Sequence, residues 1–263
     1  MDTDTSSLLL NAISWAREAG AVHLRYFRGS ELNVKSKLND SDVVTAADKA
    51  AEKLIVDHIR RTYPAHSILS EESGEENHAS EYRWVIDPLD GTTNFSQGLP
   101  LFSVSIGLER NGETLLGVVY APYVNELFHA VKGEGAYLNG EPIKASAKTE
   151  LGECVVSTGF PVDKDINPDN NVDNLTSVLP YVRGMRRLGS AAIDLSYVGA
   201  GFLDGYWELN LHEWDVSAGL LIAEEAGARF THFRSDRNIS VVASCAGIHD
   251  RLLSMLSESP KTE

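Results

Sequence analysis

Hydrophobic residues recur at every third or fourth position near the start of the chain, a spacing typical of an amphipathic helix. The members of this stripe are Leu8, Ala12, Trp15, Ala19, Val22 and Tyr26. The stripe predicts a helix over residues 6–28 that ends at Gly29. A second helical pattern starts near Thr45 and runs to Arg61, and the glycine and lysine residues before it indicate a polar loop over residues 30–42.

The middle of the chain carries short apolar runs separated by turn residues, which is typical of strands. The expected strands cover residues 67–70, 83–87, 102–109, 113–121 and 126–131. Asn111-Gly112 and Asn139-Gly140 are typical of two-residue hairpin turns. The sequence therefore predicts an antiparallel meander in this region.

From about residue 150 onward, strand-like and helix-like segments alternate as in an α/β unit. The expected strands are 155–158 and 184–188, and the expected helices are 171–182, 190–201 and 215–226. No repeat, low-complexity tract or obvious linker interrupts the chain. We expect an N-terminal α+β half over residues 1–148 and a C-terminal α/β half over residues 149–263, packed tightly as one catalytic unit.

Composition and charge narrow the class of protein. The 263 residues, 43% of them hydrophobic, can bury a sizeable core, but no apolar run reaches the roughly 18 residues of a membrane span. The N-terminus lacks the positive charge of a secretory signal, and Cys154 and Cys245 have neither metal-ligand nor disulfide-framework spacing. We therefore expect buried thiols in a cytoplasmic protein without membrane association. A net charge of -15, with no basic cluster longer than Arg60-Arg61 or Arg186-Arg187, argues against a nucleic-acid partner.

The segment with the clearest chemical meaning is Asp87-Pro88-Leu89-Asp90-Gly91-Thr92-Thr93-Asn94-Phe95, which follows the apolar run Trp84-Val85-Ile86. A buried strand would place Asp87 at its carboxyl end, and a turn at Pro88 would fold Asp90 back beside it. A helix or tight turn that opens at Gly91 would offer N–H groups to an anion beside these carboxylates, and a divalent cation would bridge the two. An Asp-rich turn followed by a capped helix is the alternative explanation.

The whole segment resembles the signature of the inositol monophosphatase family of lithium-sensitive, magnesium-dependent phosphatases. Trp214-Asp215-Val216-Ser217-Ala218-Gly219, about 125 residues downstream, is similar to the C-terminal Trp-Asp-x-x-Ala-Gly motif of that family. The resemblance covers essentially the whole chain. It implies a layered α+β and α/β sugar-phosphatase fold of five alternating αβαβα layers, a site between the two halves, and a homodimer.

The resemblance also implies the ligands of two or three Mg²⁺ ions. They are Glu71, Asp87, the backbone carbonyl of Leu89, Asp90 and Asp215. Glu71 lies in Ser70-Glu71-Glu72-Ser73, which is similar to the family's Gly-Glu-Glu-Ser with serine in place of the first glycine. Ligation by oxygen alone favours Mg²⁺ over Zn²⁺. From local sequence alone, Glu71 would be a solvated loop residue and Asp215 a helix N-cap.

Asp48 and Thr92 are the expected catalytic pair. Thr45-Ala46-Ala47-Asp48 has the spacing of a capping box with Asp in place of Glu, and Asp48 can hold this structural role together with a catalytic one. The resemblance implies that Asp48 and the hydroxyl of Thr92 orient a metal-bound water for direct attack on phosphorus, with no phosphoenzyme.

The substrate contacts are expected at two backbone segments and one side chain. The N–H groups of Gly91 and Thr92 and of Gly189-Ser190-Ala191 would hold phosphate and sugar oxygens. Glu208 matches the family's acceptor for ring hydroxyls, and an ordinary surface carboxylate is the alternative. The loop with Lys35 and Lys37 either closes over the phosphate or is simply solvated. The sequence gives no role to His212 and Glu213.

Together these features predict a Mg²⁺-dependent phosphomonoesterase, with myo-inositol 1-phosphate as the expected substrate and Li⁺ as an expected inhibitor. A fructose 1,6-bisphosphatase or a broad sugar-phosphate phosphatase is the nearest alternative. Thr93-Asn94 stands where relatives acting on 3'-phosphoadenosine nucleotides or histidinol phosphate carry Lys or Arg, which argues against both substrates. An inactive relative acting as a binding or scaffold protein would have lost part of the ligand set, and here the set is complete.

Overall fold

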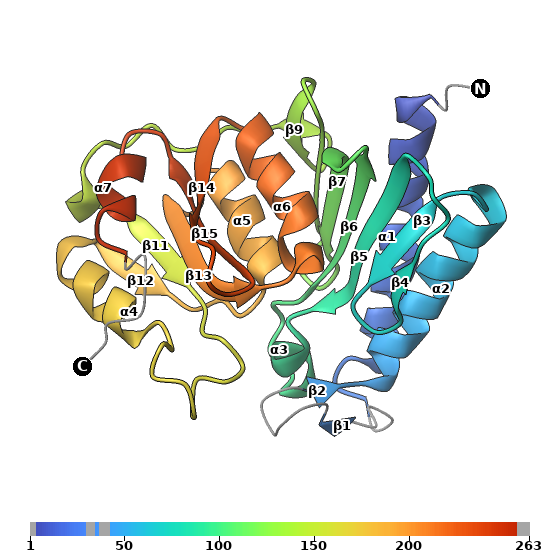
Figure 1. Cartoon of the computed structure of the whole chain (residues 1–263), viewed down its shortest axis with the longest axis horizontal. Coiled ribbons are helices and arrows are strands. Elements are labelled where there is room, and N and C mark those ends of the chain that lie inside the picture. Colours follow the sequence, from blue (N-terminus) through green and yellow to red (C-terminus); the bar gives the residue numbers. More distant parts are fainter. Residues whose placement is uncertain (1–3, 30–34, 37–42, 257–263) are drawn as a thin grey trace.

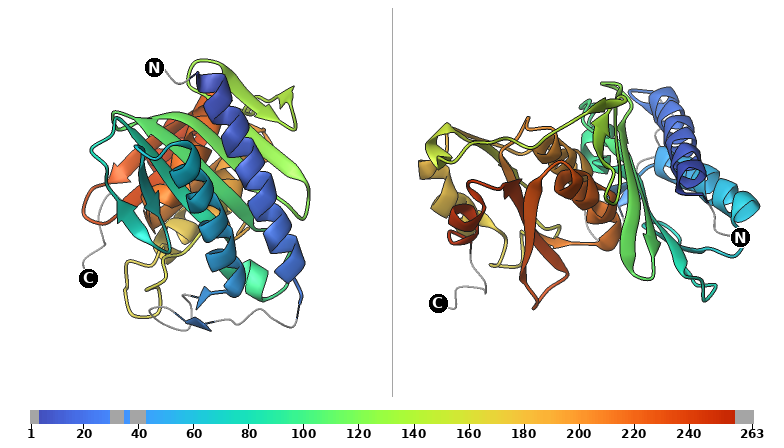
Figure 2. Two further views of the ribbon diagram at one scale, coloured as in Figure 1. Left: turned by 90° about the vertical axis from the view of Figure 1, so that its right-hand side faces the viewer. Right: turned by 90° about the horizontal axis from the view of Figure 1, so that it is seen from above.

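A computed structural model of the chain describes residues 4–29, 35–36 and 43–256. Layers of helix and sheet alternate across the molecule, with helices outside each sheet and between the two (Figures 1 and 2). The outer helices are α1 (Thr5–Tyr26) and α2 (Ala46–Thr62) on one side and α4 (Val172–Val178) and α7 (His249–Leu253) on the other, and the middle helices are α5 (Ala191–Gly199) and α6 (Glu213–Glu225). The αβαβα layering that the resemblance implied is confirmed.

The first sheet has eight strands in the order β10-β9-β8-β7-β6-β5-β3-β4. Their bounds are β3 (Ser67–Ser70), β4 (Gly74–Glu76), β5 (Tyr82–Asp90), β6 (Ser103–Arg110), β7 (Glu113–Ala121), β8 (Glu126–Val131), β9 (Gly135–Leu138) and β10 (Glu141–Pro142). From β5 to β10 each strand pairs with the next in antiparallel fashion, so the predicted meander is confirmed. At the predicted hairpin turn, Asn111 and Gly112 have φ of 53° and 82°, which only a type I′ turn combines.

The helix predicted at the start of the chain is confirmed as α1, whose apolar stripe is buried against the first sheet. It ends at Tyr26, earlier than predicted. The left-handed residue that follows is Arg28, with φ of 58°, and not the predicted Gly29. The guanidinium of Arg28 donates to the carbonyl of Gly98 at 2.9 Å, which ties this turn to the loop after α3 (Thr92–Ser96).

The second sheet has five strands in the order β12-β11-β13-β15-β14. They are β11 (Val155–Thr158), β12 (Gly184–Arg186), β13 (Gly205–Leu211), β14 (Ala228–Arg234) and β15 (Ile239–Cys245). β11 runs parallel to β12 and β13, as in the predicted α/β unit, but β15 is antiparallel to both of its neighbours. The sequence did not predict β13, β14, β15 or α7. Both faces of β13 are buried, with Tyr206 and Trp207 in different clusters of the core, so no polar alternation marked it.

Glycines let the middle helices approach the first sheet closely. A Cβ atom on Gly117 of β7 would lie 2.7 Å from the carbonyl oxygen of Ala218, and one on Gly107 of β6 would lie 2.5 Å from the hydroxyl of Ser217. Helix α6 therefore packs directly on the strand backbones, while its other side packs on the second sheet. Helix α6 therefore contacts both sheets. The division into two halves at residue 148 stays a prediction.

Two further features bear on the expected class of protein. Cys154 and Cys245 are free and buried, as predicted. Within residues 4–29, 35–36 and 43–256, no helix combines the length and the apolar character that crossing a bilayer requires.

A buried histidine should make the stability of the fold depend on pH. His23 is 0% exposed and packs edge-on against Phe95 and Phe102, and burial lowers its pKa to about 3. The unfolded chain takes up this proton near pH 6.5, so His23 destabilises the fold by about 1.4 kcal/mol per pH unit as the pH falls from 6.5 toward 3. His23→Phe should remove this contribution. Between about pH 7 and about pH 5.5, the variant should lose about 1 kcal/mol less of its urea unfolding free energy than the wild type. An identical pH dependence would contradict the assignment.

Candidate active site

Two parallel strands of the first sheet bring acidic residues together at their carboxyl ends. β3 and β5 run in parallel, and the N–H of Glu71, just after β3, donates to the carbonyl of Ile86 at 3.2 Å. This bond places Glu71 beside Asp87, the next residue of β5. Burial, and then the charges of Glu71, Asp90 and Asp215, raise the pKa of Asp87 well above its usual value. The four predicted carboxylate ligands, from distant parts of the chain, therefore act on one another.

Asp90 connects the end of β5 to the start of α5. The predicted strand continues past Pro88 to Asp90, with an irregular register between Asp87 and Asp90, instead of folding back in a turn. The hydroxyl of Ser190 and the N–H of Ala192 donate to the same oxygen of Asp90, at 2.5 and 2.8 Å. Burial raises the pKa of Asp90 to about 7, and the charge of Asp215 adds to this, although the bond from Ser190 opposes it. One carboxylate oxygen is thus held by a helix N-terminus, and the second is left for another partner.

Asp215 likewise gives one carboxylate oxygen to a helix N-terminus, at the start of α6. The helix begins at Glu213, two residues before the predicted start, and the N–H of His212 donates to Asp215 Oδ2 at 2.6 Å. The capping role that local sequence suggested is therefore present, with Asp215 in the first turn of the helix and not at the N-cap itself. The ring of His212 stacks on Trp214, with 4.6 Å between centroids.

Asp48 and Thr92 meet although 44 residues separate them. The predicted capping box is present, with the N–H of Thr45 donating to Asp48 Oδ2 at 2.8 Å. The other oxygen of Asp48 lies 3.2 Å from the hydroxyl of Thr92, which is also 3.0 Å from the carbonyl oxygen of Leu89, the predicted backbone ligand. Asp48 is 0% exposed, and burial raises its pKa to about 6 against the hydrogen bonds from Thr45.

The two predicted backbone segments of the substrate site lie against each other. Gly91 is the left-handed N-cap of α3, with φ of 89°, and a Cβ atom there would lie 3.1 Å from the carbonyl oxygen of Gly189. The side-chain amide of Asn94 joins the two segments, since it donates to the carbonyls of Leu101 and Leu188 at 2.7 Å each. Because the hydroxyl of Ser190 is engaged by Asp90, the predicted substrate contacts of residues 189–191 rest on their N–H groups.

Glu208 lies at the side of a cavity of about 410 Å³ that also reaches Glu71 and Asp215. The hydroxyl of Tyr206 donates to Glu208 at 2.6 Å, and burial raises the pKa of Glu208 to about 7. A Cβ atom on Gly159 would lie only 1.9 Å from a carboxylate oxygen of Glu208, so a larger residue there would displace this side chain. The partly buried position differs from the ordinary surface carboxylate that was the alternative.

These acidic groups suit a hard divalent cation. Their donors are all oxygens, and their raised pKa values show that the folded chain alone does not compensate the ionised forms. Among the residues that the structure describes, no three or more Asp, Glu, His or Cys side chains lie together in a group that could hold a metal ion. Asp90 and Asp215 each give one oxygen to a helix N-terminus.

The structure also shows the contacts of residues to which the sequence gave no functional role. Glu213 forms an ion pair with Arg83 of β5, and His212 contacts Trp214 and Asp215. Of the predicted lysine loop, Lys35 lies in the two-residue strand β1 (Lys35–Ser36), which pairs with β2 (Val43–Val44). Lys37 lies outside the described residues.

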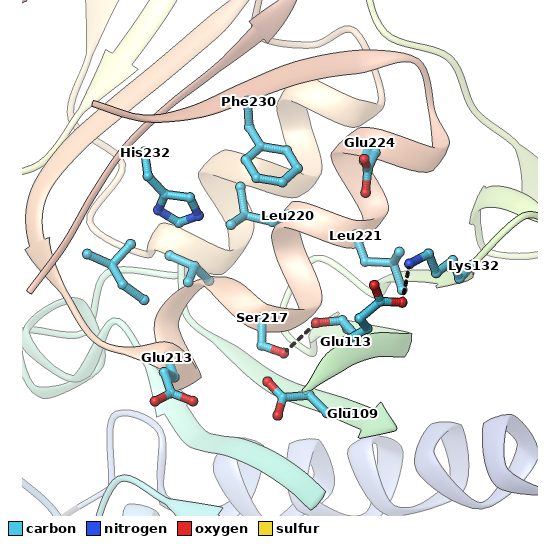
Figure 3. Close-up of a pocket in the computed structure, with 13 residues that line it drawn as sticks. Glu109, Glu113, Lys132, Glu213, Ser217, Leu220, Leu221, Glu224, Phe230 and His232 are labelled. Carbon is cyan, nitrogen blue, oxygen red and sulfur yellow. Dashed lines mark hydrogen bonds and ion pairs between the residues drawn. The ribbon is translucent and has the colours of Figure 1, made fainter. Parts of the chain in front are cut away.

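A second groove, of about 300 Å³, lies beside α6 (Figure 3). Leu220 and Phe230 contribute to its apolar lining, and glutamates surround them. Most of these glutamates are already in ion pairs. The pairs are Lys132 with Glu113 at 2.8 Å, and Arg83 with both Glu109 and Glu213. With its charges satisfied in this way, the groove has less capacity to bind a cation than the cluster around Asp87.

The arrangement of these residues can be compared with known proteins. The model of the inositol monophosphatase family matches residues 4–260. The chain belongs to this family. Members of the inositol monophosphatase family are metal-dependent phosphatases, so the general class of activity and the need for a metal follow from membership.

Individual relatives carry two kinds of name. The chain is 42% identical over 224 residues to the inositol-1-monophosphatase of Mesorhizobium japonicum, covering 84% of each protein. It is 38% identical over 257 residues to the Nus factor SuhB of Salmonella typhimurium, covering 97% of this chain and 96% of that protein. Among solved structures, the inositol monophosphatase from Anabaena (Nostoc) superposes with a TM-score of 0.87 at 41% identity over 98% of both chains.

Asp90→Asn should leave the metal-free fold at least as stable as the wild type. The asparagine keeps an oxygen to accept from Ser190 and Ala192, and it removes one charge from the repelling group. Because the folded pKa of Asp90 is raised from 3.8 to about 7, ionised Asp90 destabilises the fold increasingly as the pH rises through this interval. In EDTA, the urea midpoint of the variant should therefore equal or exceed that of the wild type, most clearly at or above about pH 7. A lower midpoint would mean that Asp90 is a purely structural cap.

Proposed function

We propose that this chain is a Mg²⁺-dependent phosphomonoesterase that hydrolyses small cyclic-polyol phosphates, with myo-inositol 1-phosphate as its preferred substrate. The observation that carries the proposal is that the Asp48–Thr92 pair lies close to the acidic cluster of proposed metal ligands. The Asp48–Thr92 pair adjoins the Leu89 carbonyl, one residue from Asp90, and the carboxylates of Glu71 and Asp215 line the cavity that Glu208 borders.

The proposed ligands of Mg²⁺ are the four carboxylates and one carbonyl that the sequence predicted. They are Glu71, Asp87, Asp90, Asp215 and the backbone oxygen of Leu89. When bound, Mg²⁺ would neutralise phosphoryl oxygens and make water a stronger acid. The number of ions stays a prediction of two or three.

Thr92 and Asp48 supply the orientation of the attacking water in this proposal. The hydroxyl of Thr92 has one proton to donate, to Asp48 or to the carbonyl of Leu89, and its lone pairs can accept a hydrogen bond from water. Asp48 is itself fixed by the N–H and hydroxyl of Thr45, so it holds Thr92 in one direction. A rigid acceptor of this kind lowers the entropy lost when water is aligned with phosphorus.

The substrate is proposed to place its phosphate near the N–H groups of Gly91 and Thr92 and its ring in the cavity. Glu208 is the proposed acceptor for ring hydroxyls, since its carboxylate is fixed by Tyr206 and faces the cavity. Fructose 1,6-bisphosphate and other sugar phosphates are the nearest alternatives, because the same groups would serve them.

A binding role is the second candidate, because several relatives carry the name Nus factor SuhB. The complete acidic set favours hydrolysis as the primary activity, and a binding role would be additional to it. The absence of a nucleic-acid partner, the cytoplasmic location, the inhibition by Li⁺ and the homodimer remain predictions from the sequence.

A phosphate-release assay tests the proposed activity directly. With Mg²⁺ present, myo-inositol 1-phosphate should be hydrolysed with a higher kcat/KM than fructose 1,6-bisphosphate, histidinol phosphate or adenosine 3',5'-bisphosphate. Excess EDTA should abolish release, and Li⁺ should inhibit it. Full activity in EDTA would overturn the metal-dependent mechanism, and a preference for another ester would replace the proposed substrate.

Thr92→Ala should lower kcat strongly and change KM little. The hydroxyl is proposed to act on the attacking water, so its contribution appears mainly in the transition state, and a loss of about 100-fold or more is expected. Thr93→Ala is the matched control, because Thr93 is the exposed neighbour in the same helix and should leave kcat within about twofold. Similar values of kcat in both variants would remove Thr92 from the mechanism.

Glu208→Gln should separate recognition of the ring from the chemistry. The glutamine still accepts from Tyr206, but it binds ring hydroxyls without a charge. We expect kcat/KM for myo-inositol 1-phosphate to fall about 10- to 150-fold, with little change for p-nitrophenyl phosphate, which has no polyol. Equal losses on both esters would show instead that Glu208 supports the metal site or the fold.

A further inference from the structure

The loop between β11 and α4, residues 159–171, forms one wall of the cavity beside the acidic site. It is the yellow segment that extends below β11 and α4 in Figure 1. Phe160, Pro161 and Val162 line the cavity together with Glu71, Glu208 and Asp215. One side of the cavity is thus apolar and another carries carboxylates. The sequence had given this loop no role.

The base of the loop is closed by a buried asparagine. The side-chain amide of Asn171 donates to the carbonyl of Gly159 at 2.6 Å and to the hydroxyl of Thr158 at 2.8 Å. Its oxygen accepts from the indole of Trp207 at 2.9 Å, and Trp207 is the neighbour of Glu208 on β13. The two ends of the loop are therefore fixed to each other and to the strand that carries Glu208.

The outer part of the loop is held by two arginines from the hairpin of β14 and β15. One terminal nitrogen of Arg237 donates to both carboxylate oxygens of Asp163, at 3.0 and 3.1 Å. Its other terminal nitrogen donates to the backbone carbonyl of Asp169 at 2.7 Å. Arg234 donates to the carboxylate of Asp169 at 2.8 Å and is shared with Asp236.

These ion pairs differ from ordinary surface pairs. The side chain of Arg234 is 0% exposed and that of Arg237 is 12% exposed, whereas exposed pairs lose most of their strength to water. Burial alone would raise the pKa of Asp169, but hydrogen bonds and charge from Arg234 and Arg237 outweigh it and hold the pKa below its usual value. Charge-assisted arginine–carboxylate hydrogen bonds that are partly shielded from water are stronger than exposed ones.

We propose that loop 159–171 is the wall that selects the leaving alcohol, and that Arg234 and Arg237 are positioning residues that hold this wall in place. A cyclic polyol has an apolar C–H face and a hydroxyl edge, and it fits between Phe160 to Val162 on one side and Glu208 on the other. A short linear polyol offers less apolar surface to the wall. The inference rests on the proposed function for its substrate, but the positioning of the loop does not.

Hydrogen exchange measures the positioning without any reaction. Arg237→Gln removes both hydrogen bonds from one terminal nitrogen to Asp163, so the amides of residues 160–170, apart from Pro161 and Pro168, which have no N–H, should exchange about tenfold faster or more, with no such change elsewhere. Arg229→Gln is the matched control, because Arg229 is on β14 and pairs with Asp250 outside the loop. Asp163→Asn tests the same bond from the more exposed partner. Unchanged exchange of the loop in both Arg237→Gln and Asp163→Asn would overturn the positioning role.

Kinetics on two esters measure the selection. For myo-inositol 1-phosphate, Arg237→Gln and Phe160→Ala should each raise KM about 10-fold and keep kcat within about twofold, with little change for glycerol 2-phosphate. Arg237→Lys should restore part of the loss, since it keeps the charge but not the fork of donors. Equal losses on both esters would overturn the selective role of the wall.

The failure of the proposed function would be visible separately. A wild-type chain that hydrolyses no ester overturns the proposed activity, while the exchange result still decides whether the arginines hold the loop. In that case, ligand binding tests whether loop 159–171 contacts the ring. With Mg²⁺ present, myo-inositol 1-phosphate should protect the amides of Phe160 and Val162 from exchange more than inorganic phosphate does, and equal protection would contradict the wall.

Discussion

Carboxylates gathered out of bulk water repel each other, and the helices around this site are arranged to offset part of that repulsion. Two such charges about 4 Å apart repel by about 4 kcal/mol at an effective dielectric constant near 20. A helix N-terminus stabilises a nearby carboxylate by up to about 2 kcal/mol. Asp48, Asp90 and Asp215 each accept bonds at the start of a different helix, α2, α5 and α6. The offset is incomplete, as the raised pKa values of Asp87 and Asp90 show, and the divalent cation that we propose would supply the remainder.

The same bonds join the two parts of the chain. Asp90 ends a strand of the first sheet and caps α5, and the amide of Asn94 connects α3 to the segment before α5. Helix α6, which carries Asp215, packs on strand backbones of the first sheet through Gly107 and Gly117. The site is therefore complete only when both sheets are packed against the middle helices.

Local patterns predicted most of the first sheet, but not the contacts that depend on distant segments. Apolar periodicity located α1 and α2, and asparagine–glycine pairs located the hairpins. The strands β13 and β15 were missed because burial on both faces removes the alternation of apolar and polar residues. The bond of Asp90 to Ser190 spans 100 residues, and that of Arg237 to Asp163 spans 74, so no local signal reports either. Motif resemblance selected the acidic residues, local sequence already suggested a capping role for Asp215, and only the fold shows that Asp90 also caps a helix.

The central claim is that the cluster around Asp87 is the cation site of this phosphatase. Crystals grown with Mn²⁺ in place of Mg²⁺ would test it most directly, because Mn²⁺ binds the same oxygen donors and gives an anomalous signal. The account predicts anomalous density in contact with Glu71, Asp87, Asp90 and Asp215. Density at other carboxylates only, or none at saturating Mn²⁺, would contradict it.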